Sequence, residues 1–208
     1  MKLFAIKSVL SGAALLYLLS ACQKPVDETL PAPVTTPETE TETPAASFVQ
    51  YHIAGGEHYS DQSAFVTVAY KEQKFLVRFD SSAVYQTIDP ANQYDINKLY
   101  GFSDNGKQHH EFSARIGWRW SDGALRLFGY IYNNTVVSYQ EIGPVSIGEE
   151  HTCSIKVSGS SYIFTVDGRS ITMPRESRGD MATGYKLYPY FGGDETAPHS
   201  MTIAIKEL

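Results

Sequence analysis

The feature that most constrains the fold of this chain is an apolar side chain at every second position in three stretches, 75–79, 153–157 and 201–205. Successive side chains of a β-strand point to opposite faces, so a period of two predicts strands that rest one face on a core. No helical pattern persists beyond about one turn, apart from a short candidate helix at 95–99. The alternating positions are Phe75, Val77, Phe79, Cys153, Ile155, Val157, Met201, Ile203 and Ile205.

Turn signals separate these strands from others. Asp167-Gly168 lies between two apolar runs, which is the strongest short signal for a β-hairpin. Asp122-Gly123 supplies another turn. The spacing gives roughly ten to twelve strands in residues 48–208, more than an immunoglobulin-like sandwich uses. We therefore predict an all-β fold, a two-sheet antiparallel β-sandwich of the jelly-roll type, with a closed up-and-down barrel as the alternative.

The first 22 residues follow the pattern of a secretory signal. Two lysines precede an apolar run over 8–19, which is too short to span a bilayer. Residues 19–22, Leu-Ser-Ala-Cys, resemble the lipobox of bacterial lipoproteins. That resemblance implies cleavage before Cys22 and lipidation of Cys22, which makes the membrane a partner of the protein. Since Gln23 and Lys24 lack the aspartate of inner-membrane retention, we expect a lipid-anchored protein of the outer membrane that faces the cell surface.

Composition divides the remainder of the chain in two. Residues 23–47 are rich in Pro, Thr and Glu and cannot bury enough apolar surface to become ordered, so they predict a disordered stalk. Residues 48–208 suit a single β-sandwich domain with one core. The formal net charge of −6 gives no electrostatic basis for binding nucleic acid. With Cys22 lipidated, Cys153 has no partner for an intramolecular disulfide, and the sequence leaves the oligomeric state open.

Three longer segments resemble known sequences. They are DINKLYGFSDNGKQHHEFSARIGWRW (95–120), YIFTVDGRSITMPR (162–175) and LYPYFGGDETAPH (187–199). They resemble uncharacterised secreted bacterial lipoproteins that share the jelly roll of the concanavalin A-like lectin/glucanase superfamily. The resemblance implies the fold but selects no activity, because this fold hosts lectins, glycoside hydrolases, polysaccharide lyases and binding modules.

Arginines and tyrosines gather on one predicted face. In the expected strand 110–120, Trp118 and Trp120 share the apolar face, while Arg115 and Arg119 lie on the other. Tyrosine stacks on sugar rings, and arginine pairs with carboxylate or sulfate. We therefore predict a groove for a polysaccharide, and more specifically for an anionic one, unless loops cover this face or the tyrosines pack on arginine stems. Its lining would be Arg115, Arg119, Tyr130, Tyr132, Tyr188 and Tyr190.

The adjacent His109 and His110 fall in an expected loop beside that face. A histidine next to arginine and tyrosine could be the base of a polysaccharide lyase, which removes the proton α to a neutralised uronate. The candidate catalytic residues are therefore His109, His110 and Tyr132, and histidines that merely cap a turn are the alternative. No third ligand has suitable spacing, so we predict no metal site at this pair.

The segment Gly192-Gly193-Asp194-Glu195 is expected to form a tight turn. Its carboxylates and carbonyls could hold a structural calcium ion, and no other cofactor is predicted.

The absence of several catalytic motifs reduces the number of functions that the sequence supports. The chain lacks the closely spaced acids of a retaining glycosidase, a Gly-x-Ser-x-Gly elbow and a phosphate loop. These absences favour a surface lipoprotein that binds a carbohydrate over a carbohydrate-active enzyme. If the protein is an enzyme, the sequence favours a lyase over a hydrolase. A structural or adhesin-like lipoprotein without a sugar ligand is the third reading.

The anchor can be tested directly. Substituting Cys22→Ala should abolish lipidation, because the alanine side chain has no sulfur to carry the lipid. The variant should then leave the detergent-rich phase in detergent phase separation and enter the aqueous phase. Unchanged partitioning into the detergent phase would contradict the lipoprotein assignment.

Overall fold

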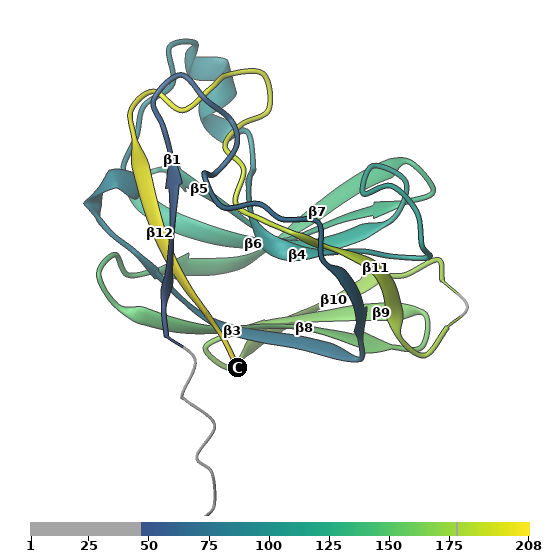
Figure 1. Cartoon of the computed structure of the whole chain (residues 1–208). Coiled ribbons are helices and arrows are strands. Elements are labelled where there is room, and N and C mark those ends of the chain that lie inside the picture. The colour runs from purple at the N-terminus through teal and green to yellow at the C-terminus, as the bar shows by residue number, and fades with distance from the viewer. Residues whose placement is uncertain (1–46, 178) are drawn as a thin grey trace, which may run out of the picture. The chain divides into compact units, whose positions relative to one another are not determined.

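The computed structural model of the chain describes residues 47–177 and 179–208 (Figure 1). The predicted signal segment, the lipidation site Cys22 and the stalk up to residue 46 lie outside the described residues, so these stay predictions.

The described residues form twelve strands and two short 3-10 helices, with no α-helix among them. The strands are β1 (Val49–Ile53), β2 (Thr67–Tyr70), β3 (Glu72–Phe79), β4 (Asn97–Ser103), β5 (Ser113–Ser121), β6 (Ala124–Asn133), β7 (Val136–Val145), β8 (Glu150–Ser158), β9 (Ser161–Val166), β10 (Arg169–Pro174), β11 (Ala182–Leu187) and β12 (Met201–Glu207). The 3-10 helices are η1 (Ser81–Ala83) and η2 (Pro90–Tyr94).

The strands form two antiparallel sheets that lie face to face (Figure 1). The first sheet has the order β1-β12-β3-β8-β9-β10, and the second has the order β2-β11-β4-β5-β6-β7. Each sheet has six strands, and the chain crosses between the sheets several times. The two-sheet sandwich is confirmed, and the closed barrel is wrong.

The core lies between the sheets and uses the alternating positions predicted from sequence. Phe75, Val77 and Phe79 of β3 are each fully buried. The other alternating positions, in β8 and β12, are also buried. Trp118 of β5 packs in the same core, within 5.4 Å of the Phe79 ring centroid. Burial of one face per strand supplies most of the driving force for this fold.

Three hairpins turn through residues with left-handed backbone. The predicted turn Asp167-Gly168 joins β9 to β10 with φ of 47° and 81°, which is the type I′ geometry that matches strand twist. Asp122-Gly123 joins β5 to β6 in the same way. Between β6 and β7, the β-branched Thr135 adopts φ of 70°, which is unfavourable for its side chain. The Thr135 amide donates a hydrogen bond to the Glu111 carbonyl over 3.1 Å.

Two sequence predictions of local structure are wrong. No helix forms at 95–99, because η2 ends at Tyr94 and strand β4 begins at Asn97. Asp89 caps η2 through its side chain, and Pro90 opens it, so the helical turn comes earlier in the chain. Strand β5 begins at Ser113 rather than at residue 110. Among the described residues, no helix has the length and apolar character to cross a membrane.

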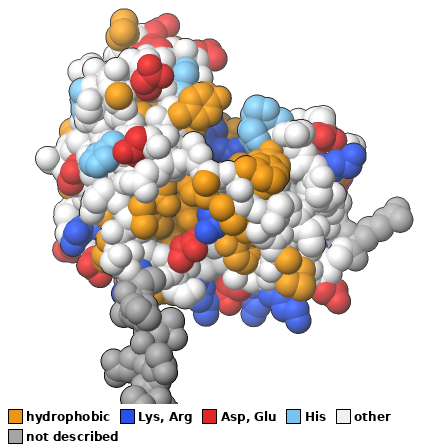
Figure 2. Space-filling view, in the orientation of Figure 1, with side chains coloured by type: hydrophobic (Ala, Val, Ile, Leu, Met, Phe, Trp, Pro, Cys, Tyr) orange, Lys and Arg blue, Asp and Glu red, His pale blue; other side chains and the backbone are white. Residues whose placement is uncertain are grey.

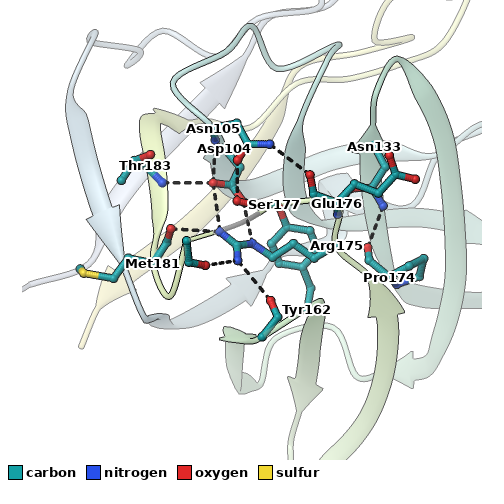
Figure 3. A network of polar contacts seen from close by, with 12 residues as sticks. Asp104, Asn105, Asn133, Tyr162, Pro174, Arg175, Glu176, Ser177, Met181 and Thr183 are labelled. Carbon is teal, nitrogen blue, oxygen red and sulfur yellow. Dashed lines mark hydrogen bonds and ion pairs between the residues drawn. The ribbon is translucent and has the colours of Figure 1, made fainter.

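A buried ion pair joins the two sheets at one end of the sandwich (Figure 3). Arg175, just after β10 of the first sheet, donates from Nε to Asp104 Oδ2 over 2.8 Å. Tyr162 of β9 donates to the same carboxylate oxygen over 2.6 Å. From the second sheet, the Thr183 amide of β11 donates to Asp104 Oδ1 over 3.2 Å. The two charged side chains are 0% and 1% exposed, so this pair lies entirely inside protein.

Breaking this pair should destabilise the domain strongly. Arg175→Met leaves the Asp104 carboxylate buried without its cation, which should lower the free energy of unfolding by about 3–5 kcal/mol. Urea denaturation measures the loss. The matched control Arg78→Met breaks the exposed Arg78–Glu150 pair and should cost less than about 1 kcal/mol. Equal losses in the two variants would contradict the structural role of the buried pair.

Candidate functional site

The outward face of the second sheet carries a row of polar and aromatic side chains. Arg115 of β5 lies opposite Tyr130 of β6, and Tyr130 lies opposite Tyr139 of β7. Directly opposed residues on neighbouring strands share a face, and Trp118 lies inside the core. The predicted separation of arginine and tryptophan in β5 therefore agrees with the structure.

A pocket of about 370 Å³ lies over this row. Figure 2 shows that the surface is hollowed, with basic side chains in the hollow and hydrophobic and histidine side chains near them. Its charged lining residues, Lys98, Arg115 and Lys186, are all basic, and no carboxylate lines it. The full lining is Tyr59, Ser60, Ser63, Lys98, His109, His110, Arg115, Tyr130, Tyr132, Lys186, Leu187, Tyr188, Pro189, Tyr190, Gly192 and Gly193.

Arg115 is the central charge of this pocket. Its side chain belongs to a residue that is only 7% exposed, and its Nε has no hydrogen-bond partner in the described part of the chain. Burial lowers the pKa of the guanidinium to about 10, while nearby phenols, first that of Tyr130, oppose the shift. The group is therefore a cation at neutral pH. A buried cation without a counter-charge is costly, and an anion in the pocket would remove that cost.

Lys98 places a second cation beside Arg115. Its ammonium donates to the Gly192 carbonyl over 2.8 Å and lies 5.1 Å from the Tyr130 ring centroid and 5.7 Å from that of Tyr190. Burial, followed by repulsion from Arg115, lowers the Lys98 pKa to about 8. Lys98 is therefore charged at neutral pH and loses its charge in mildly alkaline solution.

His109 is held in one tautomer at the pocket wall. The Tyr185 hydroxyl lies 2.9 Å from His109 Nδ1 and 3.1 Å from Gln108 Oε1. Because the glutamine oxygen can only accept, the Tyr185 proton goes to Gln108 and His109 Nδ1 donates to Tyr185. The lone pair of the ring then lies on Nε2. Burial, with Arg115 and His110 adding to it, lowers the His109 pKa to about 4, so the ring is neutral at neutral pH.

His110 and two tyrosines complete this wall. The His110 ring lies 4.2 Å from His109 and 5.3 Å from Tyr132, measured between ring centroids. Burial and then Arg115 lower the His110 pKa. Burial raises the pKa of Tyr130, so its phenol keeps its proton and can donate a hydrogen bond. The histidines predicted as candidates therefore lie beside Arg115 and Tyr132, in one pocket.

Of the predicted groove residues, Arg119 lies elsewhere, and Tyr188 packs against the core as well as lining the pocket. The Arg119 guanidinium stacks between the Tyr94 and Phe128 rings, at 5.2 and 4.8 Å, and donates to the Tyr94 carbonyl, so it is outside the pocket. Tyr188 lines the pocket, but its ring packs with core residue Tyr100, 5.9 Å away. Strand β11 ends at Leu187, so Tyr188 lies just beyond the strand.

Sequence reasoning missed Lys98, Tyr59 and the residue that positions the histidines. The Asp104 amide donates to the Phe112 carbonyl over 2.9 Å, which closes the loop that carries His109 and His110. A lysine inside an otherwise apolar strand was the available signal for Lys98. Asp104 gave no such signal, because its partner Arg175 is far away in sequence.

Hydrogen bonds to other protein groups stabilise the turn at 192–195. The Glu195 carboxylate accepts hydrogen bonds from the Ile88 and Asp89 amides over 2.9 and 2.8 Å. These hydrogen bonds lower the pKa of Glu195. The residues that the structure describes include no group of three or more His, Cys, Asp or Glu placed to hold a metal ion.

Comparison with known proteins identifies the fold. No family model and no curated protein sequence matches the chain. Its structure is similar to that of alginate lyase AlyC3, with a TM-score of 0.53 and 10% identity over 76% of this chain and 72% of that chain. It is also similar to the Bacteroides ovatus mixed linkage glucan PUL GH16 protein in complex with its product, with a TM-score of 0.50 and 12% identity over 78% and 81%.

The chain has the concanavalin A-like jelly-roll fold. The resemblance predicted from the sequence is therefore confirmed for the fold. Sequence identities of 10–12% establish the fold alone, and the chemistry of this jelly roll has to be argued from its own pocket.

The unpaired state of Arg115 has a measurable signature in stability. Arg115→Met removes a desolvated charge and keeps most of the apolar stem, so the free energy of unfolding should stay the same or rise by up to about 2 kcal/mol. Arg119→Met is the matched control, and it should lose about 1 kcal/mol because it removes stacking and hydrogen bonds. Urea denaturation measures the free energy of unfolding of both variants. A clear loss of stability in Arg115→Met would show that this arginine is structural.

Proposed function

We propose that the jelly roll binds an anionic carbohydrate in the basic pocket, with the carboxylate or sulfate of the ligand on Arg115. The observation that carries the proposal is a buried guanidinium that no carboxylate of the pocket neutralises. An anionic group that forks onto this guanidinium would supply the missing partner. In this proposal the lipid on Cys22 tethers the domain to the outer membrane at the cell surface.

The rest of the pocket supports a sugar as the carrier of that anion. Tyr130, Tyr132 and Tyr190 present amphipathic rings and hydroxyls to the pocket. Such rings stack on the apolar faces of sugars while their hydroxyls reach polar groups. Lys98 adds a second positive charge. No carboxylate lines the pocket, and the lining residue Lys186 is already paired with Glu207 over 2.6 Å. Both solved structures described above belong to proteins whose names refer to glycans.

Lyase chemistry is a second candidate, favoured by the His109 tautomer. A neutral imidazole with its lone pair on Nε2 can accept the proton α to a carboxylate, and Arg115 would neutralise that carboxylate. A tyrosine hydroxyl such as that of Tyr132 could then give a proton to the leaving glycosidic oxygen. The elimination breaks the C–O bond and leaves an unsaturated uronate, so no water or cofactor is consumed. Hydrolysis by an acid pair is not supported, since the pocket wall has no carboxylate.

A panel of polysaccharides tests the proposal. Alginate, polygalacturonate, hyaluronan and neutral β-glucan are titrated into the full-length protein in mild detergent by calorimetry. An anionic member should bind, its affinity should fall with added salt, and Arg115→Met should weaken it about tenfold or more. Binding should also weaken as pH rises through about 8, where Lys98 loses its proton, and Lys98→Met should remove that step.

The alternatives give different outcomes in the same panel. Equal binding of neutral glucan, or binding that is indifferent to Arg115→Met, would contradict an anion site. No binding by any polysaccharide would favour a structural or adhesin-like role. Ultraviolet absorbance from unsaturated ends that is lost in His109→Ala would establish the lyase, and binding without such absorbance would establish a binding protein.

A further inference from the structure

Two large aromatic rings lie exposed on opposite sides of the basic pocket. Tyr139 of β7 is 57% exposed, and Tyr59, in the segment between β1 and β2, is 69% exposed. Both are bulky side chains at positions where the fold gains little from them, because more than half of each residue contacts solvent. A tyrosine ring held in such a place offers a stacking surface to a ligand.

The Tyr139 ring continues the row that starts at Arg115. Tyr139 lies opposite Tyr130 in the register of β6 and β7. The two rings are nearly parallel, with 5° between their planes and 6.4 Å between their centroids. Tyr130 in turn lies opposite Arg115. A ligand group on Arg115 is therefore followed, strand by strand, by Tyr130 and then by Tyr139.

On the other side, Tyr190 links the pocket to Tyr59. Lys98 and Tyr190 form one backbone bridge, and Tyr190 and Tyr59 form another. The Tyr59 ring meets the Tyr190 ring edge to face at 5.0 Å. On its other side, Tyr190 stacks on His58 at 5.1 Å with 6° between planes. These contacts fix the ring of Tyr190 and leave Tyr59 projecting at the end of the row.

The row runs obliquely across the strands, because Lys98 pairs with Gly117 of β5, which is two residues along that strand from Arg115. From Tyr59 to Tyr139 it crosses Tyr190, β4, β5 and β6. Neighbouring strands are about 4.8 Å apart, so five such spacings give a length of about 24 Å along the sheet. Tyr59 lines the pocket but Tyr139 does not, so a single sugar on Arg115 would not reach the ring of Tyr139.

From this arrangement we infer that the ligand is an interior stretch of a polymer, which lies across the strands from Tyr59 to Tyr139 with an anionic sugar on Arg115. This inference rests on the proposed function and adds the length and direction of the ligand. The outer tyrosines would stack on sugars that flank the anionic one, and they require no charge on those sugars. Affinity should then depend on chain length as well as on charge.

A length series tests the inference. Dimers and hexamers of alginate, galacturonate and hyaluronan are titrated into the full-length protein in mild detergent. The hexamer that binds best should bind at least tenfold more tightly than its dimer. Tyr139→Ala should weaken the hexamer about fivefold and leave the dimer unchanged, since it removes a stacking ring outside the pocket. Tyr59→Ala should weaken the hexamer by a similar factor. Tyr139→Trp, which keeps a stacking surface, should restore hexamer binding.

The possible results distinguish this inference from the proposed function on which it rests. If dimer and hexamer bind equally and Arg115→Met weakens both, the anion site stands and the polymer inference is wrong. If hexamers bind but Arg115→Met has no effect, the proposed function is wrong. If none of the three hexamers binds, both are wrong. Melting temperatures of the tyrosine variants within error of the parent protein show that any loss of binding is not a loss of fold.

Discussion

The buried pair of Asp104 and Arg175 is the interaction on which the rest of the structure depends. It lies where β4 and β11 of one sheet meet β9 and β10 of the other, and both charges are shielded from water (Figure 3). Such a pair adds little net stability compared with apolar residues, but it tolerates no alternative partner. It therefore fixes how the two sheets are aligned. The same Asp104 closes the loop that holds the histidines, so sheet alignment and pocket geometry share one residue.

The pocket contains the opposite arrangement, a buried charge without a partner. Asp104 and Arg175 are buried together, whereas Arg115 is buried alone among phenols and other cations. The core between the sheets, with Trp118 and the phenylalanines of β3, must supply enough stability to hold this uncompensated charge. Selection for stability alone would not favour such a charge, and the proposed function accounts for it by placing the anion of a ligand on Arg115.

Sequence patterns could predict whatever depends on neighbouring residues. Alternation placed Trp118 inside and Arg115 outside, and the Asp-Gly pairs marked two hairpins, because both signals are local. Tyr188 lines the pocket although it lies one residue beyond the end of β11, and its ring also packs against the core. Arg119 was misplaced because Tyr94, which covers it, lies in a different element. Lys98 and the pair of Asp104 with Arg175 depend on contacts between distant segments, which one sequence does not reveal.

The strained turn at Thr135 has a consequence for motion. Its amide is bonded to Glu111, next to the histidines, so the tip of the β6–β7 hairpin and the histidine loop are fastened together. Tyr132 on the hairpin and His110 on the loop would then be displaced as one rigid body. A slow movement of the sheet edge would displace that whole wall and leave the distances between its residues unchanged. The opposite wall is held separately, since the Ser60 amide donates to the Pro189 carbonyl over 3.3 Å and the His58 carbonyl accepts from the Phe191 amide over 2.8 Å. A change in the width of the cleft would therefore separate two walls that each keep their own hydrogen bonds.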